Sequence, residues 1–334
     1  MTLGLEDSMS TIRPHYSEAR TILADVVPLH TPFAIQCEAS QVCNIKCNYC
    51  MQSFIVKKQK QLMGLSTFKT LCLRAKEFDT KFKQFNFAGW GEPLVNRELP
   101  DMISHLRESN VTENIAIITN GLLLAPGLSL RLVDAGTDHV RISLQGMTSE
   151  KYWEICAKGI DFTALVDQIR FLYEHKHECR VSVKIADIAL ATGEEELFYE
   201  TFESITDGMY VESIRPMFAQ NKQDGKIISK YGEEHSPVIA CPQPFFMMSV
   251  TATGDIFPCC SYYDPTKFGN ILGTSLRKVW ESCQIKKFQI MLLSGNRKEQ
   301  EYYSVCRDCH MPDAVLTPGD ELDARTEEIR RRLE

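Results

Sequence analysis

Along residues 33 to about 218, stretches in which hydrophobic residues have helical spacing alternate with stretches that have the composition of strands. Stretches with apolar residues at helical spacing include 163–175, where Leu165, Ile169 and Leu172 fall on one face. Between such stretches stand strand-like runs at 33–39, 83–89, 114–120, 139–145, 180–188 and 210–217. Alternating strands and helices predict parallel strands covered by helices, which is an α/β fold.

Six strand–helix units favour a partial (β/α)6 TIM-like barrel over the closed barrel of eight units. A second clear helical pattern covers 66–78, with Ser66 as its expected N-cap. In sheets of this kind the chemistry lies at the carboxyl ends of the strands. We therefore look for functional residues where each predicted strand ends.

The segments on either side of this core differ from it in amino-acid composition. Residues 1–32 form a polar N-terminal extension, and the core is expected to cover 33–220. A polar segment with Gly and Pro then reads as a linker. Residues 237–312 are rich in cysteine and turns and too few for a large core of their own. The tail, 313–334, is acidic and then basic, which predicts a solvated helix.

Composition excludes several classes of protein. The chain has 334 residues, 44% hydrophobic and 24% charged, which allows two domains and excludes disorder as the main state. The net charge of −7 disfavours a general nucleic-acid binder. No apolar run approaches the roughly 18 residues of a membrane span. The N-terminus has neither the basic nor the apolar region of a secretory signal, so we expect a cytoplasmic protein.

The 13 cysteines indicate metal or cluster ligation rather than disulfides. Cys43, Cys47 and Cys50 follow the first strand with the spacing C-x3-C-x2-C. Three thiolates can hold three irons of a cubane cluster and leave the fourth iron open to a small chelating molecule. A zinc site or a chance spacing is the alternative.

This loop resembles that of the radical S-adenosylmethionine (SAM) enzymes. After the second strand, Gly89-Trp90-Gly91-Glu92-Pro93 resembles the Gly-Gly-Glu-Pro motif that binds the SAM amino group, with Trp90 in place of the first Gly. The resemblance implies a SAM-binding 4Fe–4S cluster on Cys43, Cys47 and Cys50. Lys184 would pair with the SAM carboxylate, unless it is an ordinary solvated or ion-paired lysine. The other residues that the resemblance assigns to SAM are Tyr49, Gly89, Gly91, Glu92, Pro93, Thr119, Asn120, Ser143 and Gln145.

Four later cysteines form a second constellation, C-x12-G-x4-C followed by C-x2-C. They are Cys241, Cys259, Cys306 and Cys309, and Cys260 is a possible substitute for its neighbour. Four thiolates would close the coordination of a second 4Fe–4S cluster, and zinc is again the alternative. This region resembles the twitch domain, the shortened form of the SPASM domain. Because no cysteine follows Cys309, we expect one auxiliary cluster.

The cysteine spacing also resembles that of the inosamine dehydrogenases of butirosin biosynthesis and of radical SAM enzymes in sugar and capsule gene sets. This implies abstraction of a hydrogen atom from a small polyol: a sugar, aminosugar, cyclitol or nucleotide sugar. Our first expectation is oxidation of a secondary alcohol to a ketone, with the second electron passed to the auxiliary cluster. The resemblance also implies an electron donor of the flavodoxin or ferredoxin type.

Three other functions remain open. A radical epimerase would need a thiol as hydrogen donor, and Cys156, Cys260 and Cys283 are spare, although buried packing is the commoner role of such a residue. A peptide-modifying enzyme is less expected, because about 32 residues are too few for a leader-recognition domain. A non-catalytic cluster or zinc scaffold is the third.

We also expect specific roles for four residues outside these motifs. Arg215, at the end of the sixth strand, is a candidate substrate contact and catalytic residue that would assist deprotonation. Glu38, beside the first strand, is a candidate substrate contact or half of a structural ion pair. Cys37 and Cys72 lie in strand and helix patterns and are expected in the core.

Overall fold

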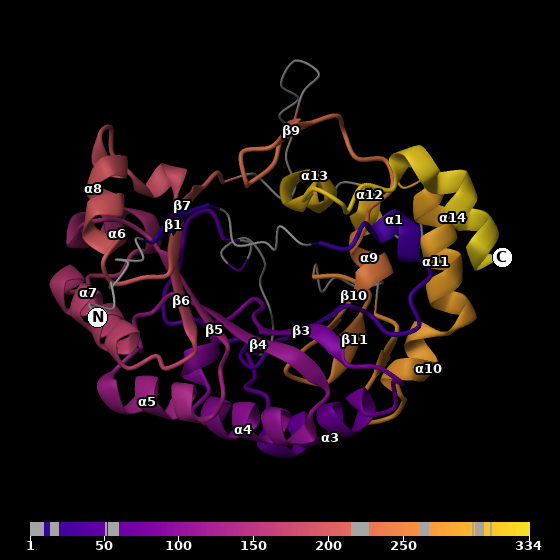
Figure 1. Cartoon of the computed structure of the whole chain (residues 1–334), viewed down its shortest axis with the longest axis horizontal. Coiled ribbons are helices and arrows are strands. Elements are labelled where there is room, and N and C mark those ends of the chain that lie inside the picture. The colour runs from indigo at the N-terminus through magenta and orange to yellow at the C-terminus, as the bar shows by residue number, and fades with distance from the viewer. Residues whose placement is uncertain are drawn as a thin grey trace, which may run out of the picture.

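The computed structural model describes residues 10–13, 20–50, 52, 60–214, 227–260, 267–295, 297, 304–307 and 309–334. Its main feature is a curved sheet in the order β1-β7-β6-β5-β4-β3-β2-β10-β11-β12, which is not closed (Figure 1). The strands from β1 to β10 in this order pair in parallel, and β11 and β12 are antiparallel. The bounds are β1 Thr11–Ile12, β2 Ala34–Cys37, β3 Phe82–Phe87, β4 Thr112–Thr119, β5 His139–Leu144, β6 Arg180–Ala186, β7 Gly208–Glu212, β10 Met247–Val250, β11 Asp255–Phe257 and β12 Gly269–Asn270. The prediction of an open α/β barrel is confirmed, since β2 to β7 are the six predicted strands.

Helices cover the outer face of the sheet (Figure 1). Leu165, Ile169 and Leu172 are the buried residues of α7, as the pattern predicts. The outer helices are α3 Leu65–Ala75, α4 Leu99–Ser109, α5 Pro126–Asp134, α6 Ser149–Cys156, α7 Phe162–Glu174 and α8 Glu194–Phe202. The short 3-10 helices η1 Pro93–Val95 and η2 Asp187–Ala189 follow β3 and β6.

The predicted cap of α3 is wrong. The helix begins at Leu65, so Ser66 lies inside its first turn, and Gly64 occupies the cap position without a side-chain bond. The Leu65 amide instead donates to the Glu98 carboxylate at 3.0 Å. A carboxylate from a distant segment thus satisfies a free N–H group that a capping serine would otherwise take.

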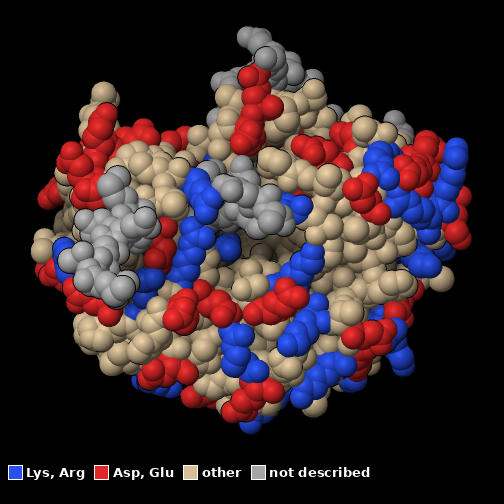
Figure 2. Space-filling view, viewed as in Figure 1, with Lys and Arg blue, Asp and Glu red and all other residues tan. Residues whose placement is uncertain are grey.

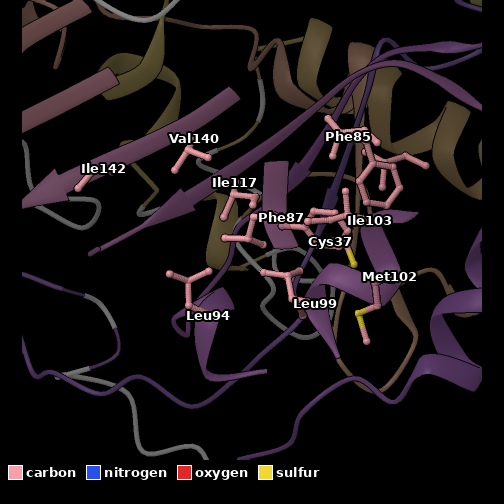
Figure 3. Close-up of a cluster of buried hydrophobic side chains, with 14 of the residues drawn as sticks. Cys37, Phe85, Phe87, Leu94, Leu99, Met102, Ile103, Ile117, Val140 and Ile142 are labelled. Atoms are coloured by element: carbon pink, nitrogen blue, oxygen red, sulfur yellow. The ribbon is translucent and has the colours of Figure 1, made fainter. Parts of the chain in front are cut away.

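The core lies between the sheet and the outer helices. Figure 3 shows strand side chains such as Phe87, Ile117 and Ile142 gathered with Leu99 and Met102 of α4. Successive residues of a strand point to opposite faces of the sheet. The polar strand residues that alternate with these apolar ones therefore point to its inner face. Other expected core residues are also confirmed: Cys37 and Cys72 are both buried.

The cysteine-rich part continues the same sheet, because β10 pairs in parallel with β2. Around it, α1, α11 and α14 share a second apolar cluster (Figure 1). The remaining elements are α1 Leu23–Val26, β8 Ile227–Ile228, β9 Glu234–His235, α9 Gln243–Phe246, α10 Leu276–Trp280, α11 Cys283–Leu293, α12 Ser304–Arg307, α13 Met311–Val315, η4 Asp323–Arg325 and α14 Thr326–Leu333. No helix in the described ranges has the length and apolarity that crossing a membrane requires.

The expectation of a merely solvated tail is wrong. Ile329 and Leu333 of α14 are buried in the second cluster. The Arg332 guanidinium also donates to the carbonyls of Ala24 and Val27, at 3.0 and 2.9 Å. Opposite its charged face, this helix has an apolar stripe that packs against α11 and α1.

Candidate functional site

The carboxyl ends of the parallel strands surround a cavity of about 320 Å³, within the range of about 300–1,000 Å³ typical of small-molecule sites. Its walls come from the cysteine loop, from the turn after β3 and from the ends of β4 to β7. Predicted site residues that line it are Cys43, Cys47, Tyr49, Cys50, Gly89, Gly91, Glu92, Thr119, Asn120, Ser143, Gln145 and Lys184. Pro93 lies beside them, buried at the start of η1. The structure therefore brings the two sets of predicted residues, iron ligands and SAM contacts, around one space.

The cysteine loop is held on two sides. The Asn48 amide donates to the carbonyl of Ile155, at the end of α6, at 2.8 Å. From β4, the Asn120 side chain donates to Asn44 Oδ1 at 2.7 Å and approaches Cys43 Sγ at 4.0 Å. Burial raises the pKa of all three thiols in the loop, those of Cys43, Cys47 and Cys50. The thiols are thus fixed and kept protonated until a metal displaces the protons.

The turn after β3 lies directly against this loop. A Cβ atom at Gly91 would stand 2.2 Å from the Ser40 carbonyl oxygen, and the next amide, that of Glu92, donates to Val42 at 2.9 Å. Only glycine permits so close an approach of two backbones. Gly91 therefore fixes the distance between the turn and the cysteines.

Glu92 joins this turn to the end of β4. Its carboxylate accepts hydrogen bonds from the Thr119 hydroxyl at 2.6 Å, the Asn120 amide at 2.7 Å and the Leu94 amide at 3.0 Å. Burial raises the pKa of this carboxyl, and the three donors oppose the shift. The bonds orient a buried carboxylate toward the cavity that it lines.

Gln145 connects the end of β5 to the cysteine loop. Its Oε1 atom accepts from the Tyr49 hydroxyl and from Cys47 Sγ, the latter at 3.5 Å, and its Nε2 donates to the Ser143 carbonyl at 3.2 Å. Burial raises the pKa of Tyr49, so its hydroxyl stays a donor. Gln145 thereby positions the ring of Tyr49 at the cavity wall.

Lys184 lines the cavity and is ion-paired, which is the alternative that the sequence left open for it. Its Nζ atom pairs with Glu212 of β7, and Lys230 Nζ lies 2.9 Å from the other carboxylate oxygen. Burial and the two lysines act in opposite directions on the pKa of Glu212, and the lysines hold it below its usual value. Sequence reasoning missed Glu212 and Lys230, although the alternation Tyr210-x-Glu212-x-Ile214 places Glu212 on the inner face of the predicted strand.

The later cysteines gather at a second site. One small pocket is lined by Cys241, Cys259, Cys260, Cys306 and Cys309. Burial and neighbouring thiols raise the pKa of Cys241 and Cys260, and that of Cys306 to about 12. Arg297, also at the pocket, donates to the Cys309 carbonyl at 3.3 Å. Within the described ranges no three Cys, His, Asp or Glu side chains meet tightly enough to hold a single ion.

Both donor sets fit iron–sulfur clusters. Thiolate is the ligand of such clusters, and each set contains only thiols. Cys43, Cys47 and Cys50 would hold one cluster at a cavity with room for a small molecule. The second set would hold a cluster with protein ligands at every iron. Whether Cys259 or Cys260 supplies the fourth ligand there stays a prediction.

The remaining candidates lie elsewhere. The Cys156 thiol is buried and donates to the Tyr152 carbonyl at 2.9 Å, and Cys283 is exposed at the start of α11. Glu38 is buried and does not line the cavity: its carboxylate accepts from Gln41 Nε2 at 2.8 Å and from the Trp90 amide at 3.2 Å. Its role is thus to hold the turn after β3. Arg215 lies outside the described residues.

Two family models match this chain. The model of the radical SAM superfamily matches residues 38–189. The model of SPASM, an iron–sulfur cluster-binding domain, matches residues 241–310. The first range contains the cysteine loop and the ends of β3 to β6 at the cavity, whereas the end of β7 with Glu212 lies outside it. The second range contains all five cysteines of the second site.

Sequence relatives match part of the chain. A GTP 3',8-cyclase of Staphylococcus haemolyticus is 31% identical over 43% of this chain and 43% of its own length. A probable GTP 3',8-cyclase of Metallosphaera sedula is 33% identical over 36% of each chain. The match therefore spans less than half the length of these two relatives.

Solved structures share the fold over most of the chain. BtrN in complex with AdoMet and 2-DOIA has a TM-score of 0.56 and 19% identity, covering 83% of this chain and 92% of that one. SuiB of Streptococcus suis, bound to the precursor peptide SuiA, has a TM-score of 0.62 and 13% identity, covering 90% and 78%. The anSMEcpe protein with bound AdoMet has a TM-score of 0.59 and 16% identity, covering 90% and 96%. At these identities the likeness concerns the fold.

Proposed function

The chain is a radical SAM enzyme with a C-terminal SPASM domain, and we propose that it oxidises a secondary alcohol of a small polyol-type substrate to a ketone. The substrate class is a sugar, aminosugar, cyclitol or nucleotide sugar. SAM and the iron–sulfur clusters, when bound, supply hydrogen-atom abstraction from a C–H bond and one-electron transfer. We further propose that the protein is cytoplasmic and receives electrons from a donor of the flavodoxin or ferredoxin type.

The division of the thiols between two sites carries this proposal. Three cysteines of one loop face the cavity, whereas the second site is closed by thiols from three separate segments. A site without an open ligand position suits electron transfer better than substrate binding. Net oxidation needs such an acceptor: hydrogen-atom abstraction removes one electron and one proton, the hydroxyl proton then leaves to solvent, and the second electron must pass to another group.

The chain's own residues give the cavity its shape and polarity. Gly91 lets the turn after β3 approach the cysteines, while Glu92 and Asn120 present bonded polar groups to the bound molecules. Tyr49 offers an aromatic face at the same wall. These groups are suited to holding the amino, carboxylate, ribose and adenine parts of SAM.

The positions of the spare thiols favour oxidation over epimerisation. Among the described residues, the only cysteines that line the cavity are Cys43, Cys47 and Cys50. Cys156 is bonded to a helix carbonyl, Cys260 lies at the second site and Cys283 is exposed on α11. An epimerase would need one of these thiols beside its substrate.

A nucleoside triphosphate is the second candidate substrate. It is favoured by the sequence relatives, which bear the name GTP 3',8-cyclase. The residues matched by the radical SAM model include most of those that line the cavity, so a substrate class shared with these relatives would bind there.

The test is a product analysis on anaerobically reconstituted enzyme with SAM and a chemical reductant. Candidate polyols, nucleotide sugars and GTP are added singly. A product lighter by two hydrogens supports the dehydrogenase. A product of unchanged mass that gains one deuterium in D2O supports epimerisation instead, and a cyclised nucleotide supports the second candidate.

Two cysteine variants test which of the two cysteine sites SAM cleavage and substrate oxidation require. The triple variant C43A/C47A/C50A should neither cleave SAM nor form product. The double variant C306A/C309A should still cleave SAM but lose net oxidation, because the second site is then incomplete. If C306A/C309A oxidises substrate at the wild-type rate, the role proposed for the second site is wrong.

A further inference from the structure

Charged side chains from three segments meet at the β6–β7 side of the cavity. Lys184 of β6 and Glu212 of β7 line the cavity and form an ion pair. Lys230, which follows β8, reaches the other oxygen of the same carboxylate at 2.9 Å. The Tyr210 hydroxyl donates to that oxygen at 3.4 Å. One carboxylate is thus shared by two lysines.

Lys230 is held there by backbone contacts on both sides. Its amide donates to the Ala314 carbonyl at 2.8 Å, and its carbonyl accepts from the Ser213 amide at 3.1 Å. Its ammonium lies 4.9 Å from the centre of the Tyr231 ring. The segment that joins the two halves of the chain therefore places a cation against Glu212, a carboxylate that lines the cavity.

Arg141 of β5 is a third cation, and it lies below the cavity, toward the amino ends of the strands. It precedes the cavity-lining Ser143 by two residues on β5, so both side chains point to the inner face. Its Nε donates to His139 Nδ1 at 3.2 Å, and in the described ranges no carboxylate pairs with it. Burial lowers the pKa of Arg141, an effect that the nearby Tyr210 and Tyr231 oppose.

The cluster carries more positive than negative charge. Among the residues that the structure describes, this cluster holds three cations, Arg141, Lys184 and Lys230, and one carboxylate, that of Glu212, which is an excess of two positive charges. Partly buried charges that lack a counter-charge are unfavourable, so the arrangement is suited to receive an anion. Figure 2 shows Lys and Arg side chains on both sides of the hollow at the centre of the face in view, and Asp and Glu side chains below it.

We propose that Arg141, Lys184 and Lys230 bind an acidic group of the substrate, either a phosphate ester or a carboxylate. A phosphate matches the two unbalanced charges best, and both guanidinium and ammonium groups bind it well. The inference rests on the proposed function, since the bound molecule is the substrate of that reaction. It narrows the polyol class to phosphorylated or acidic members. The SAM carboxylate is the other source of the same chemistry.

The experiment measures binding of inorganic phosphate and, separately, of SAM to the anaerobically reconstituted holoenzyme by calorimetry. Wild type should bind phosphate, and Lys230→Met and Arg141→Met should each weaken that binding about tenfold or more. Lys176→Met is the matched control, because Lys176 is similarly exposed and pairs with Asp207 at 2.7 Å away from the cavity. This control should keep the wild-type phosphate affinity.

A charge-retaining variant and the SAM measurement complete the experiment. Lys230→Arg retains the charge and should retain phosphate binding, so a loss in Lys230→Met alone is a loss of charge and not of folding. Absence of phosphate binding in wild type overturns the proposal. A parallel loss of SAM affinity in Lys230→Met assigns the cluster to the SAM carboxylate and also overturns it. An enzyme that binds phosphate but never cleaves SAM rejects the proposed function and leaves the anion site standing.

Discussion

The Thr119 hydroxyl donates a 2.6 Å hydrogen bond to the Glu92 carboxylate, and this bond joins the end of β4 to the turn after β3. The Asn120 amide completes the link from the same strand end. Two strand ends that line the cavity are therefore fixed to each other by one buried side chain. Their spacing does not depend on the bound molecules alone.

We expect Glu92→Gln to destabilise the protein. The side-chain amide nitrogen would place a donor where the Asn120 amide or the Leu94 amide now donates, and an unsatisfied buried donor costs about 1–3 kcal/mol. Urea unfolding of the reconstituted protein measures the change. Glu113→Gln, on the exposed side of β4, is the control and should unfold with wild type. Equal midpoints for all three proteins would contradict the structural role of Glu92.

Gly91→Ala should disturb the cysteine loop itself. The new Cβ would stand 2.2 Å from the Ser40 carbonyl oxygen, which belongs to backbone and cannot rotate away. We expect loss of about 1–3 kcal/mol or more from overpacking, together with loss of the iron bound at Cys43, Cys47 and Cys50. Iron per chain and the melting temperature measure both effects. Gly127→Ala has open space around the added methyl and should match wild type; wild-type iron in Gly91→Ala would refute the argument.

Much of the fold was predictable because the sheet is regular. Alternation along β5 puts Val140 and Ile142 in the core and Arg141 and Ser143 inside the barrel, and this pattern is legible in the sequence. The cysteine spacings were equally informative, since ligands of one cluster must be close. The start of α3 and the packing of the tail were not predictable, because the Leu65 amide bonds to the distant Glu98 carboxylate and the tail packs against a distant helix.

The candidate site was predicted in its motifs but not in its charges. Lys184 could be placed at the end of a strand, but its partner Glu212 depends on the pairing of β6 with β7. The position of Lys230 could not be predicted from local pattern, because it reaches Glu212 at the cavity wall from the segment between the two halves of the chain. Contacts of long sequence separation set the electrostatics of this cavity.

Assembly of the first cluster should improve as the pH rises. Burial raises the pKa of the Cys43 and Cys50 thiols above the ordinary value of about 8.5, so fewer thiolates exist at any given neutral pH. Each iron–sulfur bond must then release a proton, and a higher pH favours that release. Iron per chain after anaerobic reconstitution at about pH 7 and about pH 8.5 measures this. The triple variant C43A/C47A/C50A isolates the second site, and an equal or larger wild-type yield at the lower pH would contradict the prediction.

Removal of one adjacent cysteine should distinguish the ligand of the second cluster from its neighbour. Cys259 and Cys260 both line the pocket, but the spacing from Gly254 favours Cys259. Gly254 has a φ of +84°, and the Cys259 that follows it lies near Cys241 and Cys306, whose thiol pKa values it helps to raise. We expect C259A to lose about four irons per chain, the content of one cluster, and C260A to keep them. Iron and sulfide analysis of the two variants, made in one preparation series, checks this. The reverse result would assign the fourth iron to Cys260, and equal retention would mean that either thiol can close the site.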